Sequence, residues 1–147
     1  MTIADRRRLT IQEAEALLAA DRRIADMAQL LHHAQGLGQL AQSLRTLRFT
    51  LEVHFCSEEA PDGFFDMVRE RAAAYVSRVE QLRQEHVVLL RETELILDRI
   101  RACVAGPVAE IMRQAGALAD RIERHEATEN DLLGEAMSTD VGAGDEA

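Results

Sequence analysis

The stretch LAQSLRTLRFTLEVHFCSEE, residues 40–59, decides the fold class. Its leucines recur every three or four positions, and His54 and Glu58 continue the same line. Residues spaced by three and four lie on one face of an α-helix. The stretch therefore predicts a helix that buries one face, with an imidazole and a carboxylate on the buried face. Burying such groups is costly unless partners meet them, so other polar side chains are expected to converge on the same place.

Local signals give the limits of this helix and of the helix before it. Thr10 and Glu13 have the spacing of a capping box, which begins a helix at that point. Gly36-Leu37-Gly38 ends the first helix and precedes the second. Pro61-Asp62-Gly63 is a strong turn signal and ends the second helix at about Glu59.

The second half of the chain predicts two more helices. The third begins near Phe64 and continues to Cys103. Its first part, from Phe64 to Gln81, must run beyond the polar level and return, and we expect it to be a helical extension that covers one end of the bundle. Gly106-Pro107 closes the third helix and opens the fourth, which is expected to fade near Ser138.

Each of the four predicted helices carries one apolar seam. This pattern is typical of an all-α protein whose helices pack as an antiparallel up-down-up-down four-helix bundle. The length fits one domain, predicted as residues 1–137, followed by a short polar tail over residues 138–147.

Composition narrows the function classes. The 147 residues carry a formal net charge of −9, which argues against nucleic-acid binding, because that function needs a basic face. No apolar run approaches the roughly 20 residues of a membrane span, and no signal-peptide pattern is present. Two cysteines are too few for a disulfide framework. We therefore expect a cytoplasmic protein that binds no nucleic acid and no membrane, and we consider a homodimer as its assembly.

Polar side chains interrupt all four seams at one level. If short connections join antiparallel neighbours, each hairpin brings its own polar groups to the same height. Two of the interruptions are HxxxE turns, whose spacing places both side chains on one helix face. The predicted convergent set is Asp21, His54, Glu58, His86, His125 and Glu129.

Three imidazoles and three carboxylates in an apolar bundle favour a metal site. Unpaired buried carboxylates would shift towards their neutral form, whereas two divalent cations offset their charge. Mixed nitrogen and oxygen ligands suit iron, manganese or zinc better than calcium or magnesium. Glu58 and Glu129 can each bridge, which favours two metals about 3.5–4 Å apart. The alternative is that these histidines are hydrogen-bonded core residues without a metal.

Other polar residues receive simpler interpretations. His32 and His33 lie off the seam near a helix C-terminus, where a cationic group is favourable, and are not expected to bind metal. Glu59, Glu85 and Glu126 flank the predicted ligands. We expect these three on a solvated face, and the alternative is that they hydrogen-bond the imidazoles.

Four motifs in order resemble the hemerythrin-like proteins, the HHE cation-binding group, over residues 12–136. HFCSEE (54–59) resembles the second-helix HFxxEE element, and LRQEHVVLL (82–90) is similar to the third-helix EH motif. HEATENDLLGEA (125–136) resembles the fourth-helix HxxxE element, and LLAADRRIADMAQLL (17–31) resembles the first-helix motif. The tail STDVGAGD (138–145) also looks like a tail found in some members.

The resemblance implies a non-haem di-iron site in a four-helix bundle. By position it implies bridging roles for Glu58 and Glu129 and terminal roles for the three histidines of the predicted set. Asp21 stands where the family usually has His, and Leu90 stands where oxygen-carrying members have a second His.

Such a site is poorer in nitrogen, which disfavours reversible oxygen carriage. We therefore expect a protein that binds or senses O2, NO or redox state, or handles iron. The alternatives are an oxidoreductase acting on peroxide or another small oxidant, and a metal-free bundle for protein interaction.

Overall fold

The computed structural model describes residues 10–103 and 108–142, and within those ranges the protein is helical with no strands. The helices are α1 (Ile11–His32), α2 (Leu37–Glu59), α3 (Phe64–Arg69), α4 (Ala74–Ala102) and α5 (Val108–Gly142). The prediction of an all-α protein with four long helices is confirmed. The predicted Gly106-Pro107 turn lies outside the described residues, as does the tail after Gly142.

The first helix begins as its sequence predicts. The Thr10 hydroxyl accepts a hydrogen bond from the Glu13 backbone N–H at 3.1 Å, and the Glu13 carboxylate accepts one from the Thr10 backbone N–H at 3.0 Å. This capping box satisfies two backbone donors that a helix N-terminus leaves free.

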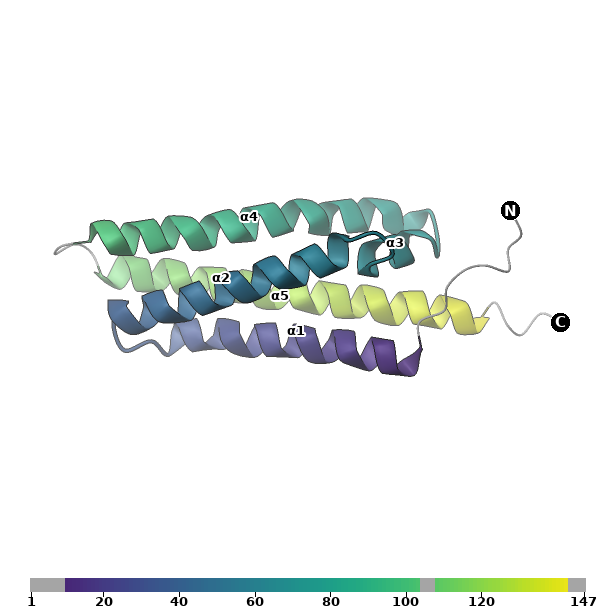
Figure 1. Cartoon of the computed structure of the whole chain (residues 1–147), viewed down its shortest axis with the longest axis horizontal. Helices are drawn as coiled ribbons and strands as arrows, with labels where there is room; N and C mark the ends of the chain where they lie inside the picture. The colour runs from purple at the N-terminus through teal and green to yellow at the C-terminus, as the bar shows by residue number, and fades with distance from the viewer. Residues whose placement is uncertain (1–9, 104–107, 143–147) are drawn as a thin grey trace.

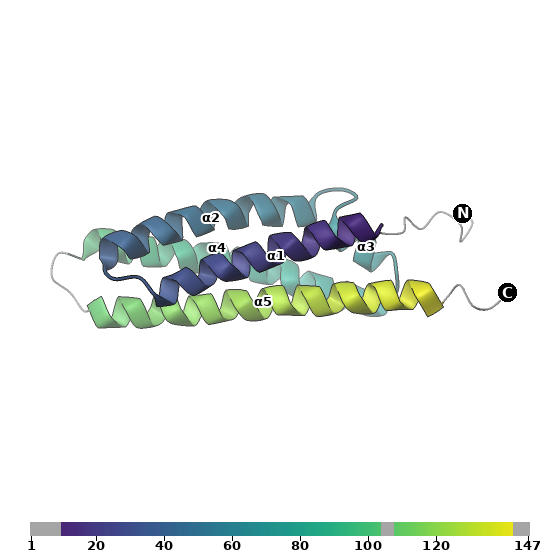
Figure 2. The ribbon, with the colours of Figure 1, turned by 90° about the horizontal axis from the view of Figure 1, so that it is seen from below.

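The four long helices lie side by side in both ribbon views (Figure 1, Figure 2). Each contacts two others, because α1 packs against α2 and α5, and α4 also packs against α2 and α5. In Figure 1 the chain runs from right to left along α1 and α4, and from left to right along α2 and α5. This arrangement turns one face of every long helix towards a common interior.

The interior holds two apolar clusters with the polar level between them. The larger cluster is built on the α2 leucines, with Ile24, Leu89 and Ile122 from the other three helices. The smaller one contains Phe65, Val79 and Leu132, among others. Each buried leucine or isoleucine contributes roughly 1.5–3 kcal/mol to folding. The clusters therefore hold the helices in register on both sides of the polar residues.

The prediction of one continuous third helix is wrong, because residues 70–73 separate α3 from α4. A continuous helix would carry Phe64 and Phe65 beyond the end of the bundle. Folding α3 back instead leaves the two rings 6% and 1% exposed, which offsets the few helical hydrogen bonds lost at the break. The expectation that this part covers one end is met by α3, which contacts α2, α4 and α5.

The turn after α2 reverses the direction of the chain, so that α3 packs against the end of the bundle next to the polar level. Asp62 has φ 60°, a left-handed conformation that Asp tolerates better than most residues. At Gly63 a Cβ would lie 2.6–2.8 Å from the backbone oxygens of Ser57, Glu58 and Ala60. Only glycine fits there without movement of the backbone, which is why the predicted turn ends with it.

The fourth long helix extends past Ser138, where it was expected to fade, to Gly142. Tyr75 Oη lies 3.1 Å from Thr139 Oγ1 and so ties this last part of α5 to the start of α4. Among the described residues, none of the helices combines the length and apolar character needed to cross a membrane.

Candidate metal centre

The six residues predicted as ligands lie together, and all six are buried. Four different helices supply them, so their convergence depends on the whole bundle. Asp21 comes from α1, His54 and Glu58 from α2, His86 from α4, and His125 and Glu129 from α5.

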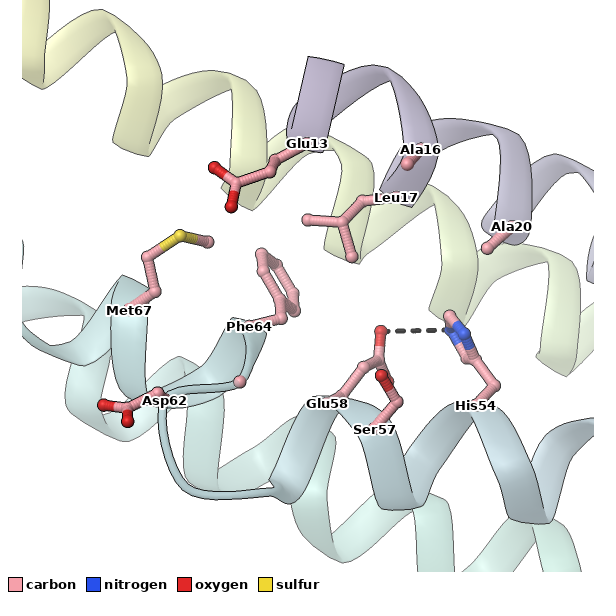
Figure 3. Close-up of a pocket in the computed structure, with 11 residues that line it drawn as sticks. Glu13, Ala16, Leu17, Ala20, His54, Ser57, Glu58, Asp62, Phe64 and Met67 are labelled. Atoms are coloured by element: carbon pink, nitrogen blue, oxygen red, sulfur yellow. Dashed lines mark ion pairs between the residues drawn. The ribbon is translucent and has the colours of Figure 1, made fainter. Parts of the chain in front are cut away.

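One group of ligand atoms surrounds His54. Its Nε2 lies 3.0 Å from Glu58 Oε1 and 3.3 Å from Asp21 Oδ1. Glu129 Oε2 lies 3.8 Å from the same nitrogen. The oxygens of this group come close enough to one another and to the nitrogen to surround one ion. We call this group the His54 position; Figure 3 shows its His54–Glu58 pair.

A second group contains the other two imidazoles and Glu129. His125 Nε2 lies 2.9 Å from Glu129 Oε1, and His86 Nε2 lies 3.2 Å from the same oxygen. Glu58 Oε2 is 3.3 Å from His86 Nε2. We call this group the His86–His125 position.

Glu58 and Glu129 each serve both positions with different oxygens. Glu58 directs Oε1 to His54 and Oε2 to His86. Glu129 directs Oε2 to His54 and Oε1 to His86 and His125. A carboxylate that turns one oxygen to each of two imidazole groups has the geometry of a ligand bridging two metals.

Several buried atoms at this level make no well-aligned hydrogen bond to another described residue, although most lie within 4 Å of an oppositely charged group. They are Asp21 Oδ1, His54 Nε2, Glu58 Oε2, His125 Nε2 and Glu129 Oε2, together with both carboxylate oxygens of Glu126. Such orphaned polar groups are rare in folded proteins and costly. Divalent ions would satisfy the nitrogens and oxygens together, so the donor set fits a pair of metals.

Two glutamates orient the imidazoles from outside. Glu59 Oε1 lies 2.7 Å from His86 Nδ1, and Glu85 Oε2 lies 2.8 Å from His125 Nδ1. A carboxylate that accepts the Nδ1–H leaves Nε2 free to bind a metal. For these two residues the alternative interpretation, a hydrogen bond to an imidazole, therefore holds. They are partly exposed, but each reaches inward to a ring nitrogen.

Two aromatic rings stack against His86. Phe55 stacks on its ring with centroids 3.6 Å apart and an interplanar angle of 6°, and Phe65 of α3 stacks at 5.1 Å and 17°. The short helix α3 therefore serves the site by packing against a candidate ligand. Sequence periodicity could not predict this contact, because it depends on the break between α3 and α4.

Glu126 was expected on a solvated face, and this is wrong. Its side chain is 2% exposed, and Oε2 lies 3.7 Å from His54 Nε2. The signal was available in part, since Glu126 precedes Glu129 by three positions and shares much of its helix face. Adjacent His125 already occupied the predicted seam, so a second inward residue beside it was not expected.

Without metal, protonated imidazoles offset the negative charge of the buried carboxylates. Burial lowers the pKa of His54, but contacts with the carboxylates of Asp21, Glu129 and Glu58 outweigh it and raise the pKa to about 12. For His86 burial also opposes the shift, and the carboxylates raise its pKa to about 9. Both rings are therefore positively charged at neutral pH in the metal-free protein.

The carboxylates divide into ionised and protonated groups. Burial acts to raise the pKa of Glu129, but its contacts with His125, His54 and His86 prevail and hold that pKa well below its usual range. Burial and the charge of Glu129 raise the pKa of Glu126 to about 10. Glu129 is thus the carboxylate that the three imidazoles keep charged.

A pocket of about 370 Å³ reaches the His54 position from the surface. His54 and Glu58 are among its lining residues, and its walls come from α1, α2, α3 and the turn between the last two (Figure 3). Its wall is mostly apolar, with Leu17, Phe64 and Met67 among the lining residues. The pocket gives a small molecule access to one side of the centre.

The remaining histidines lie away from the centre, as expected. His32 and His33 are exposed, and His32 Nε2 lies 3.0 Å from Asp120 Oδ1 of α5. Leu90 is half-buried against the larger apolar cluster.

Comparison of the chain with known protein families, with characterised proteins and with solved structures found no match.

Proposed function

We propose that this chain is a hemerythrin-like protein that holds two iron ions inside an antiparallel four-helix bundle. The observation that carries the proposal is the bridging geometry of Glu58 and Glu129, each of which turns its two oxygens to different imidazoles. The same carboxylates in a metal-free core would leave buried atoms unsatisfied.

Different residues of the chain would bind each of the two ions. His54 and Asp21 would hold one ion, His86 and His125 the other, and the bridging carboxylates both. Manganese or zinc are the alternative metals for this ligand chemistry. A bound di-iron pair would supply redox chemistry towards O2, NO or peroxide, which supports a role in binding or sensing such molecules or in handling iron.

The apolar pocket beside His54 and Glu58 supports a small, weakly polar ligand. Its volume exceeds what a diatomic molecule needs, and the apolar wall would limit water around the centre. We place the protein in the cytoplasm, a proposal that rests on Cys56 and Cys103 being unpaired.

Metal analysis of protein purified without chelator, together with its absorption spectrum, tests the proposal. We expect about two irons per chain and near-ultraviolet charge-transfer bands. Glu135 of α5 is an exposed residue that pairs with Arg78. The variant Glu135→Gln is therefore a matched control, and it should bind the same amount of iron as the wild type. Folded protein that stays colourless and metal-free after anaerobic addition of Fe2+ would instead support a metal-free bundle for protein interaction.

A second candidate function is turnover of peroxide or another small oxidant at the same metals. The observation that favours it is the pocket that leads from the surface to His54 and Glu58, because turnover requires continuous exchange of substrate and product. Iron-loaded protein that decomposes hydrogen peroxide over many cycles would support this function. Reaction limited to one equivalent per centre would favour sensing.

A further inference from the structure

The carboxylate of Glu126 has no structural task in the fold. It is buried in the bundle, and neither oxygen has a hydrogen-bond partner among the described residues. A glutamate that served packing alone would be costly here, since an apolar side chain of similar size would fill the same space without desolvating a polar group.

Glu126 lies outside the group of four ligand atoms that are all within 4.8 Å of one another, but it is as close to His54 as one member of that group. Its Oε2 lies 3.7 Å from His54 Nε2, no farther than the 3.8 Å of Glu129 Oε2. Two atoms that bind one ion at about 2.1 Å lie roughly 3.0–4.2 Å apart at angles of 90–180°. The distances from His54 Nε2 to Asp21, Glu58, Glu126 and Glu129 are 3.3, 3.0, 3.7 and 3.8 Å, and all fall in this range.

Helix α5 contributes side chains to both the His54 position and the His86–His125 position. His125 faces α4, where Glu85 accepts from its ring, whereas the next residue, Glu126, faces His54 of α2. Adjacent residues of a helix point about 100° apart. Glu129, three positions after Glu126, reaches both positions.

Charge gives an independent reason for a fourth carboxylate. Two divalent cations carry four positive charges, and Asp21, Glu58 and Glu129 supply three negative ones. Ionised Glu126 supplies the fourth, so that the buried centre is neutral without a bound anion.

We propose that Glu126 is a ligand of the metal at the His54 position, so that this position combines one imidazole with four carboxylates. The His86–His125 position has two imidazoles and the two bridging carboxylates. Oxygen-rich sites suit Mn2+, whereas imidazole suits iron and zinc. The two positions therefore differ in selectivity, and Mn2+ competes better at the His54 position. This inference rests on the proposed function, since it requires that the centre bind two metals.

The test titrates metal-free protein with Mn2+ and follows free and bound ion by electron paramagnetic resonance. Wild-type protein should bind two Mn2+ per chain with unequal affinity. Glu126→Gln and Glu126→Leu should each weaken one position by at least about tenfold and leave the other unchanged. Glu135→Gln, exposed on the same helix, is the matched control and should behave as wild type.

Stability in urea separates a ligand from a structural residue. Without metal, Glu126→Leu should unfold at higher urea than wild type, because it removes a buried carboxyl group that makes no hydrogen bond to a described residue and lies 3.7 Å from its nearest imidazole nitrogen. Weaker metal binding together with a more stable metal-free fold supports the inference. Unchanged Mn2+ affinity in both Glu126 variants, or equal loss at both positions, would overturn it while leaving the two-metal proposal intact. Wild-type protein that binds neither Mn2+ nor Fe2+ would overturn the proposed function and this inference together.

Discussion

At the scale of single residues, Glu58 and Glu129 differ from every other candidate ligand because each contacts imidazoles of both positions. Removing a bridge should therefore affect two ions, whereas removing a terminal imidazole should affect one. We expect Glu58→Ala and Glu129→Ala to retain no metal after desalting. His86→Ala should retain about one ion per chain. Metal analysis measures the number of ions that each variant retains. Equal loss in all three variants would contradict the division into bridging and terminal ligands.

Asp21 gives a second test at this scale, because it belongs to the His54 position alone. It reaches His54 although its side chain is shorter than an imidazole. Its neighbour Ala20 and Ala28, two turns along α1, take little space, as expected for a helix that must approach closely. Asp21→Ala should lose one ion selectively, and Asp21→His should keep two. Metal content and spectrum unaltered in Asp21→Ala would remove Asp21 from the ligand set.

Protons and metals compete for the same imidazoles. With pKa values raised to about 12 for His54 and about 9 for His86, both rings carry a proton at pH 7 in the metal-free protein. A metal binds only the neutral ring, so binding must release these protons and the apparent affinity must rise with pH. For His86 the rise should level off above about pH 9.

Calorimetry in buffers of different ionisation enthalpy measures this release. When both positions fill at pH 7, we expect on the order of two protons from His54 and His86, and a further one from Glu126, whose raised pKa keeps it protonated before metal binds. A binding heat that does not depend on the buffer would show that the rings are neutral before metal arrives.

At the scale of elements, the sequence was sufficient to predict the four long helices and six of the buried polar residues that lie between them. The buried leucines of α2 and the HxxxE turns of α2 and α5 were predicted, because a spacing of three and four has few alternatives in so helical a sequence. The break after α3 was not predicted, since Val68, Ala72 and Tyr75 keep helical spacing across it. What breaks the helix is the burial of Phe64 and Phe65 against other elements, and periodicity carries no information about such contacts.

Glu126 shows the same limit within one helix. A seam predicted at one residue per turn leaves no place for an inward residue next to His125. Because α1 and α4 both pack against α5, the adjacent residues His125 and Glu126 can both be buried. The number of neighbours around a helix is a property of the packed bundle, and a single helix sequence does not reveal it.

The turn between α2 and α3 can be tested through Gly63. A Cβ there would lie within 3 Å of three backbone oxygens, so Gly63→Ala should destabilise the metal-free protein by roughly 1–3 kcal/mol. Gly134→Ala on α5 is the matched control, because its added Cβ would meet no atom within 4 Å apart from its chain neighbours and the backbone of its own helix. That control should be neutral or stabilising by up to about 1 kcal/mol. Urea unfolding measures both, and equal stability of the two variants would contradict the role of the turn.

At the scale of the whole molecule, the centre joins all four long helices, so metal binding should stabilise the entire bundle. Ions that bind the folded state alone contribute about 4 kcal/mol when their free concentration is 1,000 times Kd. Chelation should therefore lower the melting temperature by several degrees, and re-addition of metal should restore it. Circular dichroism during heating measures the effect. A melting temperature unchanged by complete metal removal would favour the metal-free bundle.

The central claim is that two metals share Glu58 and Glu129 between the His54 and His86–His125 positions. Anomalous diffraction from crystals of the metal-loaded protein tests it most directly, because it locates each ion without assumptions about ligands. We expect two peaks about 3.5–4 Å apart, each about 2.0–2.2 Å from one oxygen of Glu58 and one oxygen of Glu129. A single peak, or peaks away from these carboxylates, would contradict it.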